Sequence, residues 1–125
     1  MNPEEIKLLQ VLESYEELLN SETQAIAVAD LDKLEVILES KDEVLAQVLD
    51  AQAQVPEDSR KNDILDALID RVTELQSRNA RALGSLIRSQ VKEKEATGEG
   101  SSRLKKVREA YFSHMGASDG GVRKK

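Results

Sequence analysis

The chain has 125 residues, a formal net charge of −6, a single histidine and no cysteine. The lack of cysteine excludes a disulfide framework and a thiolate metal site, and one histidine leaves little for a histidine-based metal or catalytic centre. Ala, Glu, Lys, Leu and Arg supply about half of the residues, a composition typical of long helices and coiled coils.

Charge is distributed unevenly along the chain. Residues 1–60 carry 15 acidic and 4 basic side chains, a net charge of −11, whereas residues 61–125 carry 9 acidic and 14 basic ones, a net charge of +5. Opposite charges favour packing of the two halves against each other, and the acidic excess argues against nucleic acid as the main partner. No apolar run approaches the roughly 18 residues of a membrane span. Because the first residues are acidic rather than basic, we expect a cytoplasmic protein without membrane insertion.

Residues 3–54 form the first predicted helical region. Asn2 and Glu5 have the spacing of a capping box, and Pro3 suits the first helical position. Two mostly apolar heptad rows follow, two residues out of phase. The rows are Leu8, Leu12, Tyr15, Leu19, Glu22, Ile26 and Ala29, then Leu31, Leu34, Leu38, Lys41, Leu45, Val48 and Gln52. The phase change predicts a slip within one long helix or a break capped by Asp30, and the helix-forming residues 25–29 favour one long helix.

A second helix is predicted over residues 59–97. Pro56 ends the first region, and Asp58 or Ser59 can cap the helix that follows. Its heptad row contains Leu65, Leu68, Val72, Leu75, Asn79, Ala82, Leu86 and Ser89. A single Asn in such a row sets the register of the helices at some cost in stability, so Asn79 is predicted to set register, and Asn79→Leu is expected to stabilise the fold.

The C-terminal part of the chain is predicted to form a separate short helix. Residues 98–102 are rich in Gly and Ser and indicate a hinge after the helical bundle of residues 1–97. An amphipathic helix is expected over residues 103–116, with a narrow apolar row of Leu104, Val107 and Tyr111, and residues 117–125 are expected to be disordered. Tyr111 and its neighbour Phe112 are two of only three aromatic residues in the chain. This helix either docks on a partner as an anchor-bearing helix or packs back on the bundle.

The sequence contains no convincing catalytic pattern. Adjacent carboxylates such as Glu4 and Glu5 point about 100° apart on a helix, so they do not converge on one substrate. Neither His114 nor the short Gly98-Glu99-Gly100 motif stands in a recognisable catalytic or phosphate-binding context. We therefore expect a protein that is not an enzyme and that has no metal site and no cofactor.

The order of several segments resembles a known family. Leu18-Leu19 is followed by DLDKL at 30–34, LESKDEVL at 38–45 and NARAL at 79–83, and Tyr111 comes shortly before a glycine. Over residues 5–116 this arrangement resembles the FlgN-like flagellar type III export chaperones, with the FliT-like chaperones as near relatives. The short Lys-rich tail departs from the family's pattern.

The resemblance implies a cytoplasmic bacterial chaperone that binds late flagellar subunits, typically hook-associated proteins, and delivers them to the export gate. It implies that the C-terminal helical region binds the client through Leu104, Val107 and Tyr111, and that Tyr111 also contacts the export gate. Phe112 joins this client-binding set as the neighbouring aromatic side chain. The fold expected is all-α, either an elongated antiparallel hairpin or a three-helix coiled-coil-like bundle with a short mobile C-terminal helix. The alternative function is a structural coiled-coil adaptor or regulator that acts by helix–helix oligomerisation. The sequence leaves open whether the protein forms a homodimer.

Overall fold

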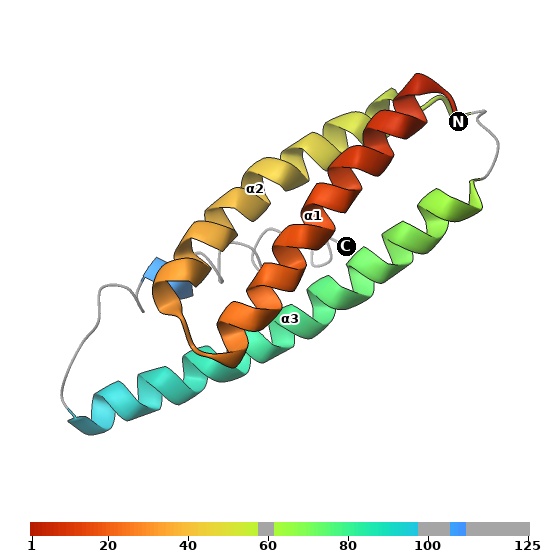
Figure 1. Ribbon diagram of the computed structural model, residues 1–125. Coiled ribbons are helices and arrows are strands. Elements are labelled where there is room, and N and C mark those ends of the chain that lie inside the picture. The colour runs from red at the N-terminus through yellow and green to blue at the C-terminus, as the bar shows by residue number, and fades with distance from the viewer. Residues whose placement is uncertain (58–61, 98–105, 110–125) are drawn as a thin grey trace, which may run out of the picture.

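The computed structural model describes residues 1–57, 62–97 and 106–109, with side chains placed through residue 92 and again at 106–109. The protein is an all-α bundle of three long helices, as predicted, and the described residues contain no strand. Helix α1 covers Pro3–Ala27, α2 covers Leu31–Gln54 and α3 covers Asp63–Thr97 (Figure 1). Residues 106–109 form a short fourth helical segment.

Helix α1 is the central element of the bundle. It packs against both α2 and α3, whereas α2 and α3 make no close backbone contact with each other. Helix α2 runs antiparallel to α1, and α3 runs parallel to it (Figure 1). Two α1–α3 contacts confirm the parallel alignment, because Glu16 pairs with Arg71 and Thr23 pairs with Asn79 further along both helices. The three-helix form of the predicted fold is therefore the correct one, and α3 packs closely on α1 rather than antiparallel on α2.

The capping box at the start of α1 is present as predicted. The Asn2 side chain accepts a hydrogen bond from the backbone N–H of Glu5 at 2.8 Å, and the Glu5 side chain accepts one from the Asn2 N–H at 3.0 Å. Pro3 occupies the first turn, where its missing N–H costs nothing. These contacts fix the N-terminal end of the central helix.

The prediction of one long helix over residues 3–54 is wrong, because the chain breaks between Ala27 and Leu31. Ala29 adopts a positive φ of 55°, the left-handed conformation that ends many helices. The Asp30 N–H bonds to the carbonyl of Ala25, and the Ala29 N–H bonds to that of Ile26, which together form a Schellman motif. Asp30 then caps α2 by accepting from the Lys33 N–H, so the alternative break at Asp30 is the one found.

The left-handed Ala29 predicts a stabilising substitution. Ala29→Gly should raise the free energy of unfolding by about 0.5–1 kcal/mol, because glycine adopts a positive φ without the steric penalty of a Cβ atom. Ala46→Gly is the matched control, since Ala46 is exposed within α2 and the same change there should lower stability by about 1 kcal/mol. Urea denaturation of both variants measures the two effects, and a loss of stability in Ala29→Gly would contradict the prediction.

Helix α3 begins later than predicted, at Asp63 instead of residue 59. Asn62 is its capping residue, and its side-chain oxygen accepts hydrogen bonds from the N–H groups of Ile64 and Leu65. Asp58 and Ser59, the predicted caps, lie outside the described residues. An Asn at this position serves as well as Asp or Ser, since all three place a short acceptor over the first turn.

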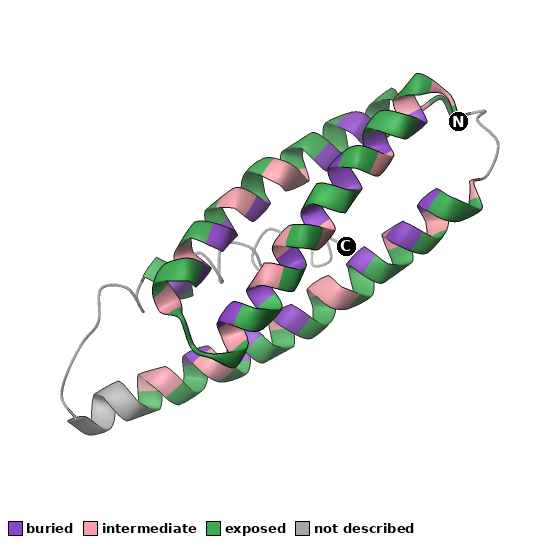
Figure 2. Cartoon of the chain, viewed as in Figure 1, coloured by how far each residue is buried: buried purple, intermediate pink, exposed green. Residues whose placement is uncertain are grey.

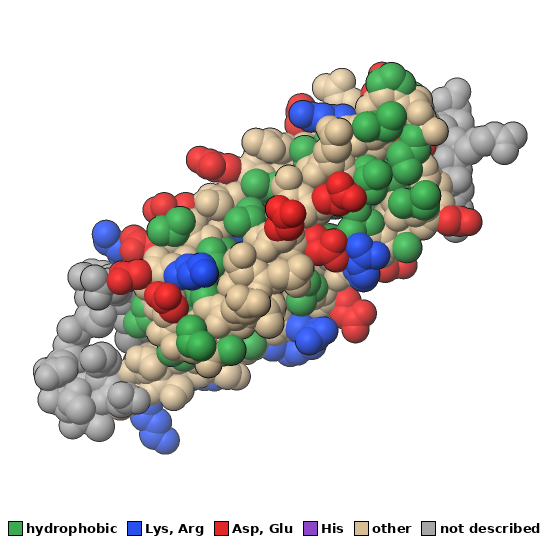
Figure 3. Space-filling view, viewed as in Figure 1, with side chains coloured by type: hydrophobic (Ala, Val, Ile, Leu, Met, Phe, Trp, Pro, Cys, Tyr) green, Lys and Arg blue, Asp and Glu red, His purple; other side chains and the backbone are tan. Residues whose placement is uncertain are grey.

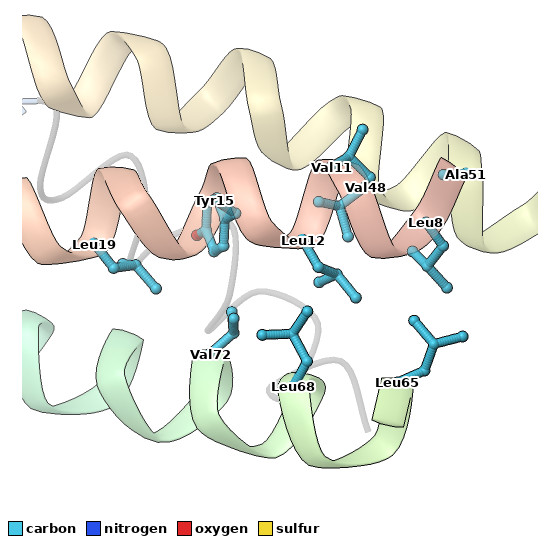
Figure 4. Close-up of a cluster of buried hydrophobic side chains, with 10 residues drawn as sticks. All are labelled: Leu8, Val11, Leu12, Tyr15, Leu19, Val48, Ala51, Leu65, Leu68 and Val72. Carbon is cyan, nitrogen blue, oxygen red and sulfur yellow. The ribbon is translucent and has the colours of Figure 1, made fainter. Parts of the chain in front are cut away.

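Buried residues form two apolar clusters along the bundle (Figure 2). In the first cluster, side chains of α1 point toward α3 on one side and toward α2 on the other (Figure 4). It contains Leu8, Val11, Leu12, Tyr15, Leu19, Val48, Ala51, Leu65, Leu68 and Val72. The second cluster lies at the end of the bundle where α1 turns into α2, and it contains Ala25, Leu34, Ile37, Leu38, Leu83, Ile87 and Val107.

The heptad row predicted for α3 holds only over its first half. Leu65, Leu68, Val72 and Asn79 are buried, but the next buried apolar residues are Leu83 and Ile87 instead of the predicted Ala82 and Leu86. A straight α-helix has 3.6 residues per turn, so its inner face drifts away from a strict seven-residue repeat. The second half of α3 therefore follows the straight-helix period and not the seven-residue repeat.

Candidate functional site

Of the predicted client-binding residues, the structure describes only Val107. Leu104, Tyr111 and Phe112 lie outside the described residues, as do the predicted hinge and tail. Val107 is fully buried, with 0% of its side chain exposed, in the second apolar cluster. The described part of the C-terminal segment thus packs on the bundle, which is one of the two arrangements considered for it.

The buried side chains that form one cluster with Val107 come from all three long helices. Ala25 belongs to α1, Leu34 and Leu38 belong to α2, and Leu83 and Ile87 belong to α3. We call this set of residues, together with Ile37, the Val107 site. The backbones of α2 and α3 make no close contact with each other. A side chain from a fourth element can therefore join the cluster to which both helices contribute. The Val107 site is consequently a place where the three-helix bundle accepts an apolar residue from a separate segment.

A charged contact lies beside the Val107 site. Lys106, the residue before Val107, places its Nζ atom 3.5 Å from an Oε atom of Glu35 on α2. The Lys106 side chain is largely exposed and Glu35 is half-buried, so this ion pair is screened by water and contributes at most about 1 kcal/mol. Most of the stabilisation at this contact therefore comes from the burial of Val107.

A buried polar layer separates the two apolar clusters. Glu22, Lys41 and Asn79 are only 1%, 2% and 3% exposed, although two of them carry charge. The Lys41 Nζ atom donates to both carboxylate oxygens of Glu22, at 3.0 and 3.1 Å. Asn79 donates from Nδ2 to Glu22 at 3.0 Å and to the Leu19 carbonyl at 2.8 Å. Glu22 of α1, Lys41 of α2 and Asn79 of α3 therefore meet in a single hydrogen-bonded layer.

Thr23 completes this layer on the α1 side. Its hydroxyl lies 2.9 Å from the Asn79 Oδ1 atom and 2.9 Å from the Leu19 carbonyl oxygen. Asn79 consequently has hydrogen-bond partners on both ends of its amide. The register-setting role of Asn79 stays a prediction, and sliding α3 by one turn would separate the amide from Thr23, Leu19 and Glu22 together.

Sequence reasoning identified Asn79 but did not assign a role to Glu22 and Lys41. Each of the two was placed on a predicted heptad row, where a charged residue is unusual. The available signal was the presence of one acidic and one basic residue on inward-facing rows of neighbouring helices. Since the separation of these rows in space depends on the turn at Ala29, the pairing could not be deduced before the turn was known.

Burial shifts the proton affinities around this layer. Desolvation lowers the pKa of Lys41 below its ordinary value, while the neighbouring Glu22 carboxylate opposes that shift. Burial of the Tyr15 phenol, with smaller contributions from the negative charges of Glu22 and Asp42, raises the pKa of Tyr15 to about 12. The first apolar cluster therefore holds a phenol that keeps its proton in strongly alkaline solution.

The raised pKa of Tyr15 predicts an alkaline titration. Since the folded state keeps the phenol proton from pH 10.0 to about 12, stability linked to neutral Tyr15 is complete below pH 10.0 and is lost as the pH rises through this window. Tyrosinate absorbance should show a step near pH 12 that is absent from Tyr15→Phe, which should also lose stability less steeply above pH 10.0. A Tyr15 that titrates near pH 10.0 in the folded protein would contradict the prediction.

The surface offers weaker candidates for a site. A depression of about 510 Å³ lies where α1 begins and α2 ends, and Glu4, Lys7 and Asp50 are among its lining residues. Lys7 and Asp50 are exposed, so water solvates these charges. Apolar side chains also gather at the α1 start on the face shown in Figure 3. Large apolar side chains are exposed at Met1, Ile6, Val28, Val36, Leu49 and Ile64.

The described part of the chain lacks two further kinds of feature. No helix in it is both long and apolar enough to cross a membrane. It also contains no group of three or more His, Cys, Asp or Glu side chains that could hold a metal ion. Comparison of the chain with protein-family models, with curated proteins and with solved structures found no match in any of the three.

Proposed function

We propose that this protein is a cytoplasmic export chaperone of the FlgN-like type. In this proposal it binds a late flagellar subunit of the hook-associated class and delivers it to the type III export gate. The observation that carries the proposal is the burial of Val107, a residue of the C-terminal segment, in an apolar site formed by the three helices of the bundle. A chaperone for amphipathic helices needs apolar surface that is covered when the client is absent.

The size of the described contact suits an exchangeable segment. Full burial of one valine side chain stabilises by about 1.5–3 kcal/mol, and an exposed ion pair such as Lys106–Glu35 adds at most about 1 kcal/mol. A short helix is marginal in water by itself, so this segment depends on the bundle or on a partner for its stability. A client helix that offers several apolar residues can compete with a contact of this size.

The client contacts proposed for the C-terminal segment follow its apolar row. Leu104, Val107 and Tyr111 would share one face of the helix, with Phe112 about 100° away from Tyr111. In the complex, Val107 leaves the bundle, the apolar row contacts the client, and Tyr111 also contacts the export gate. Aromatic anchors of this kind contribute strongly to helix recognition because they bury large areas with few rotatable bonds.

Purified hook-associated subunits from the same genome test the proposal. We expect a complex that depends on the amphipathic terminal segment of the client and that Tyr111→Ala weakens by about 1–3 kcal/mol, without loss of helicity. Phe112→Ala is the matched control and should have a smaller effect. Calorimetry measures the affinities, and circular dichroism checks the fold. Absence of binding to every hook-associated subunit would overturn the chaperone function.

The alternative function is an adaptor that acts by helix–helix oligomerisation. Exposed Ile6 near the start of α1 and Ile64 near the start of α3 favour it, because the parallel alignment brings these two helix starts to the same end of the bundle. Sedimentation of the protein without a client discriminates the two functions. A stable oligomer that Ile6→Lys or Ile64→Lys dissociates, together with no binding of flagellar subunits, would support the adaptor.

A further inference from the structure

The Val107 site has a defined chemical character on each of its sides. Its floor is apolar, since the buried Val107 side chain belongs to one cluster with Leu34, Leu38, Leu83 and Ile87. Its α2 edge is acidic, because Glu35 lies one position after Leu34 and reaches the ammonium group of Lys106. The residue that enters the apolar floor and the residue that meets the acidic edge are consecutive in the sequence of the docked segment.

We infer that the Val107 site recognises a helix by a basic residue that directly precedes a buried apolar residue. In the described structure Lys106 and Val107 supply this pair from the chain itself. The partner that this chemistry selects is an amphipathic helix with the same basic–apolar pair, which takes the site when the C-terminal segment leaves it. The inference rests on the proposed function only for the identity of this partner as an export client.

Charge on α2 supports a basic partner helix in preference to an acidic one. Helix α2 carries six acidic residues and two basic ones, and one of the two, Lys41, is already paired with the buried Glu22. An acidic partner helix beside Glu35 would therefore meet repulsion along α2, whose exposed basic residue is Lys33 in its first turn. The apolar floor supplies most of the affinity, and the acidic edge supplies the choice between partners.

Recognition also requires that the apolar floor not stay open to water. The six residues of the Val107 site other than Val107 include two leucines on α2 and two large aliphatic residues on α3, all buried. If the C-terminal segment left and nothing replaced it, the apolar surface beneath Val107 would be exposed at a cost proportional to its area. A partner helix that brings an apolar residue into the same position removes this cost.

A peptide in trans tests the inference without a flagellar client. The probe is a fluorescent peptide with the sequence of residues 98–116, and the receptor is the full chain carrying Val107→Asp, which disfavours occupation of the site by its own segment. We expect the peptide to bind, and the same peptide with Val107→Asp to bind at least about tenfold more weakly, as loss of a buried valine requires. Equal binding of the two peptides would overturn the inference.

The charge preference is tested by a swap across the contact. A peptide with Lys106→Glu should bind about two- to fivefold more weakly than the unchanged peptide, the range expected of an exposed ion pair. Introducing Glu35→Lys into the receptor should reverse that order. Glu13→Lys is the matched control, because Glu13 is an exposed residue of α1 and the substitution makes the same change in net charge. If Glu35→Lys leaves the order of the peptides unchanged, or if Glu13→Lys reverses it equally, the acidic edge does not select the partner.

Folding of the receptor is checked by circular dichroism. Should Val107→Asp fail to fold, the full chain with Val107→Ala replaces it, since that change removes apolar contact without burying a charge. The same ranking of peptides is then required. Failure of this ranking overturns the inference even if hook-associated subunits bind, whereas a correct ranking upholds it even if they do not.

Discussion

Replacing Lys41 with alanine should lower the free energy of unfolding by about 3–5 kcal/mol. Lys41 and Glu22 are almost completely buried and are joined by two hydrogen bonds. Without the ammonium group, the Glu22 carboxylate keeps only the Asn79 amide as a partner of those described, inside an apolar bundle. The charge must then stay buried without compensation or take up a proton, and either outcome costs free energy.

The exposed Glu16–Arg71 pair supplies the matched control. Its geometry is good, with an Arg71 Nε to Glu16 Oε2 distance of 2.9 Å, and its hydrogen bonds lower the pKa of Glu16. Arg71 is 62% exposed, however, so Arg71→Ala should cost at most about 1 kcal/mol. Urea denaturation compares the two variants. If Lys41→Ala lowers the free energy of unfolding no more than Arg71→Ala does, the Lys41 ammonium group does not stabilise the buried Glu22 carboxylate.

Asn79→Leu should lower the free energy of unfolding by about 1–3 kcal/mol. The sequence pattern alone led to the opposite expectation, because an Asn on a heptad row usually stabilises the fold less than a leucine at the same position. The contacts of Asn79 reverse the expected sign. Its amide donates to the Leu19 carbonyl and to Glu22, and its oxygen faces the Thr23 hydroxyl. Leucine would remove a donor from a buried carboxylate and place an apolar side chain next to the ion pair.

Ala82→Leu tests whether the loss is specific to the polar layer. Ala82 lies on the same helix three residues later and is exposed, so the added side chain there should change stability by less than about 0.5 kcal/mol. Thermal unfolding of both variants, followed by circular dichroism, measures the difference. A higher melting temperature for Asn79→Leu would mean that desolvation of the Asn79 amide outweighs its three contacts.

The fold class was predictable because it depends on local chemistry. Apolar residues recur at helical spacing throughout the chain, and the capping box of Asn2 and Glu5 lies entirely within one turn. The boundaries were less predictable. The end of α1 has no glycine, and the left-handed conformation falls on Ala29, a residue whose propensity favours continuing the helix. Tertiary packing of α2 against α1 overrode that local preference.

The candidate site was predictable only as a set of residues. The apolar row of the C-terminal segment identified Val107 as an inward-facing residue, but periodicity cannot say whether the opposing surface belongs to the same chain. The burial of Val107 in one cluster with Leu34 of α2 and Leu83 of α3 answers that question for Val107. Glu35, the residue that faces Lys106, gave no signal in the sequence, since it is one of many exposed or half-exposed acids on α2.

The sequence alone predicted that this protein is helical, where α1 begins and which face the first half of α3 turns inward, because hydrogen bonding and side-chain period act over a few residues. Only the tertiary structure decided that α3 lies parallel to α1, that Glu22, Lys41 and Asn79 meet in one layer, and that Val107 fills a site between the helices. The physical reason is that these contacts join residues many positions apart, and the turn at Ala29 determines which of them can meet.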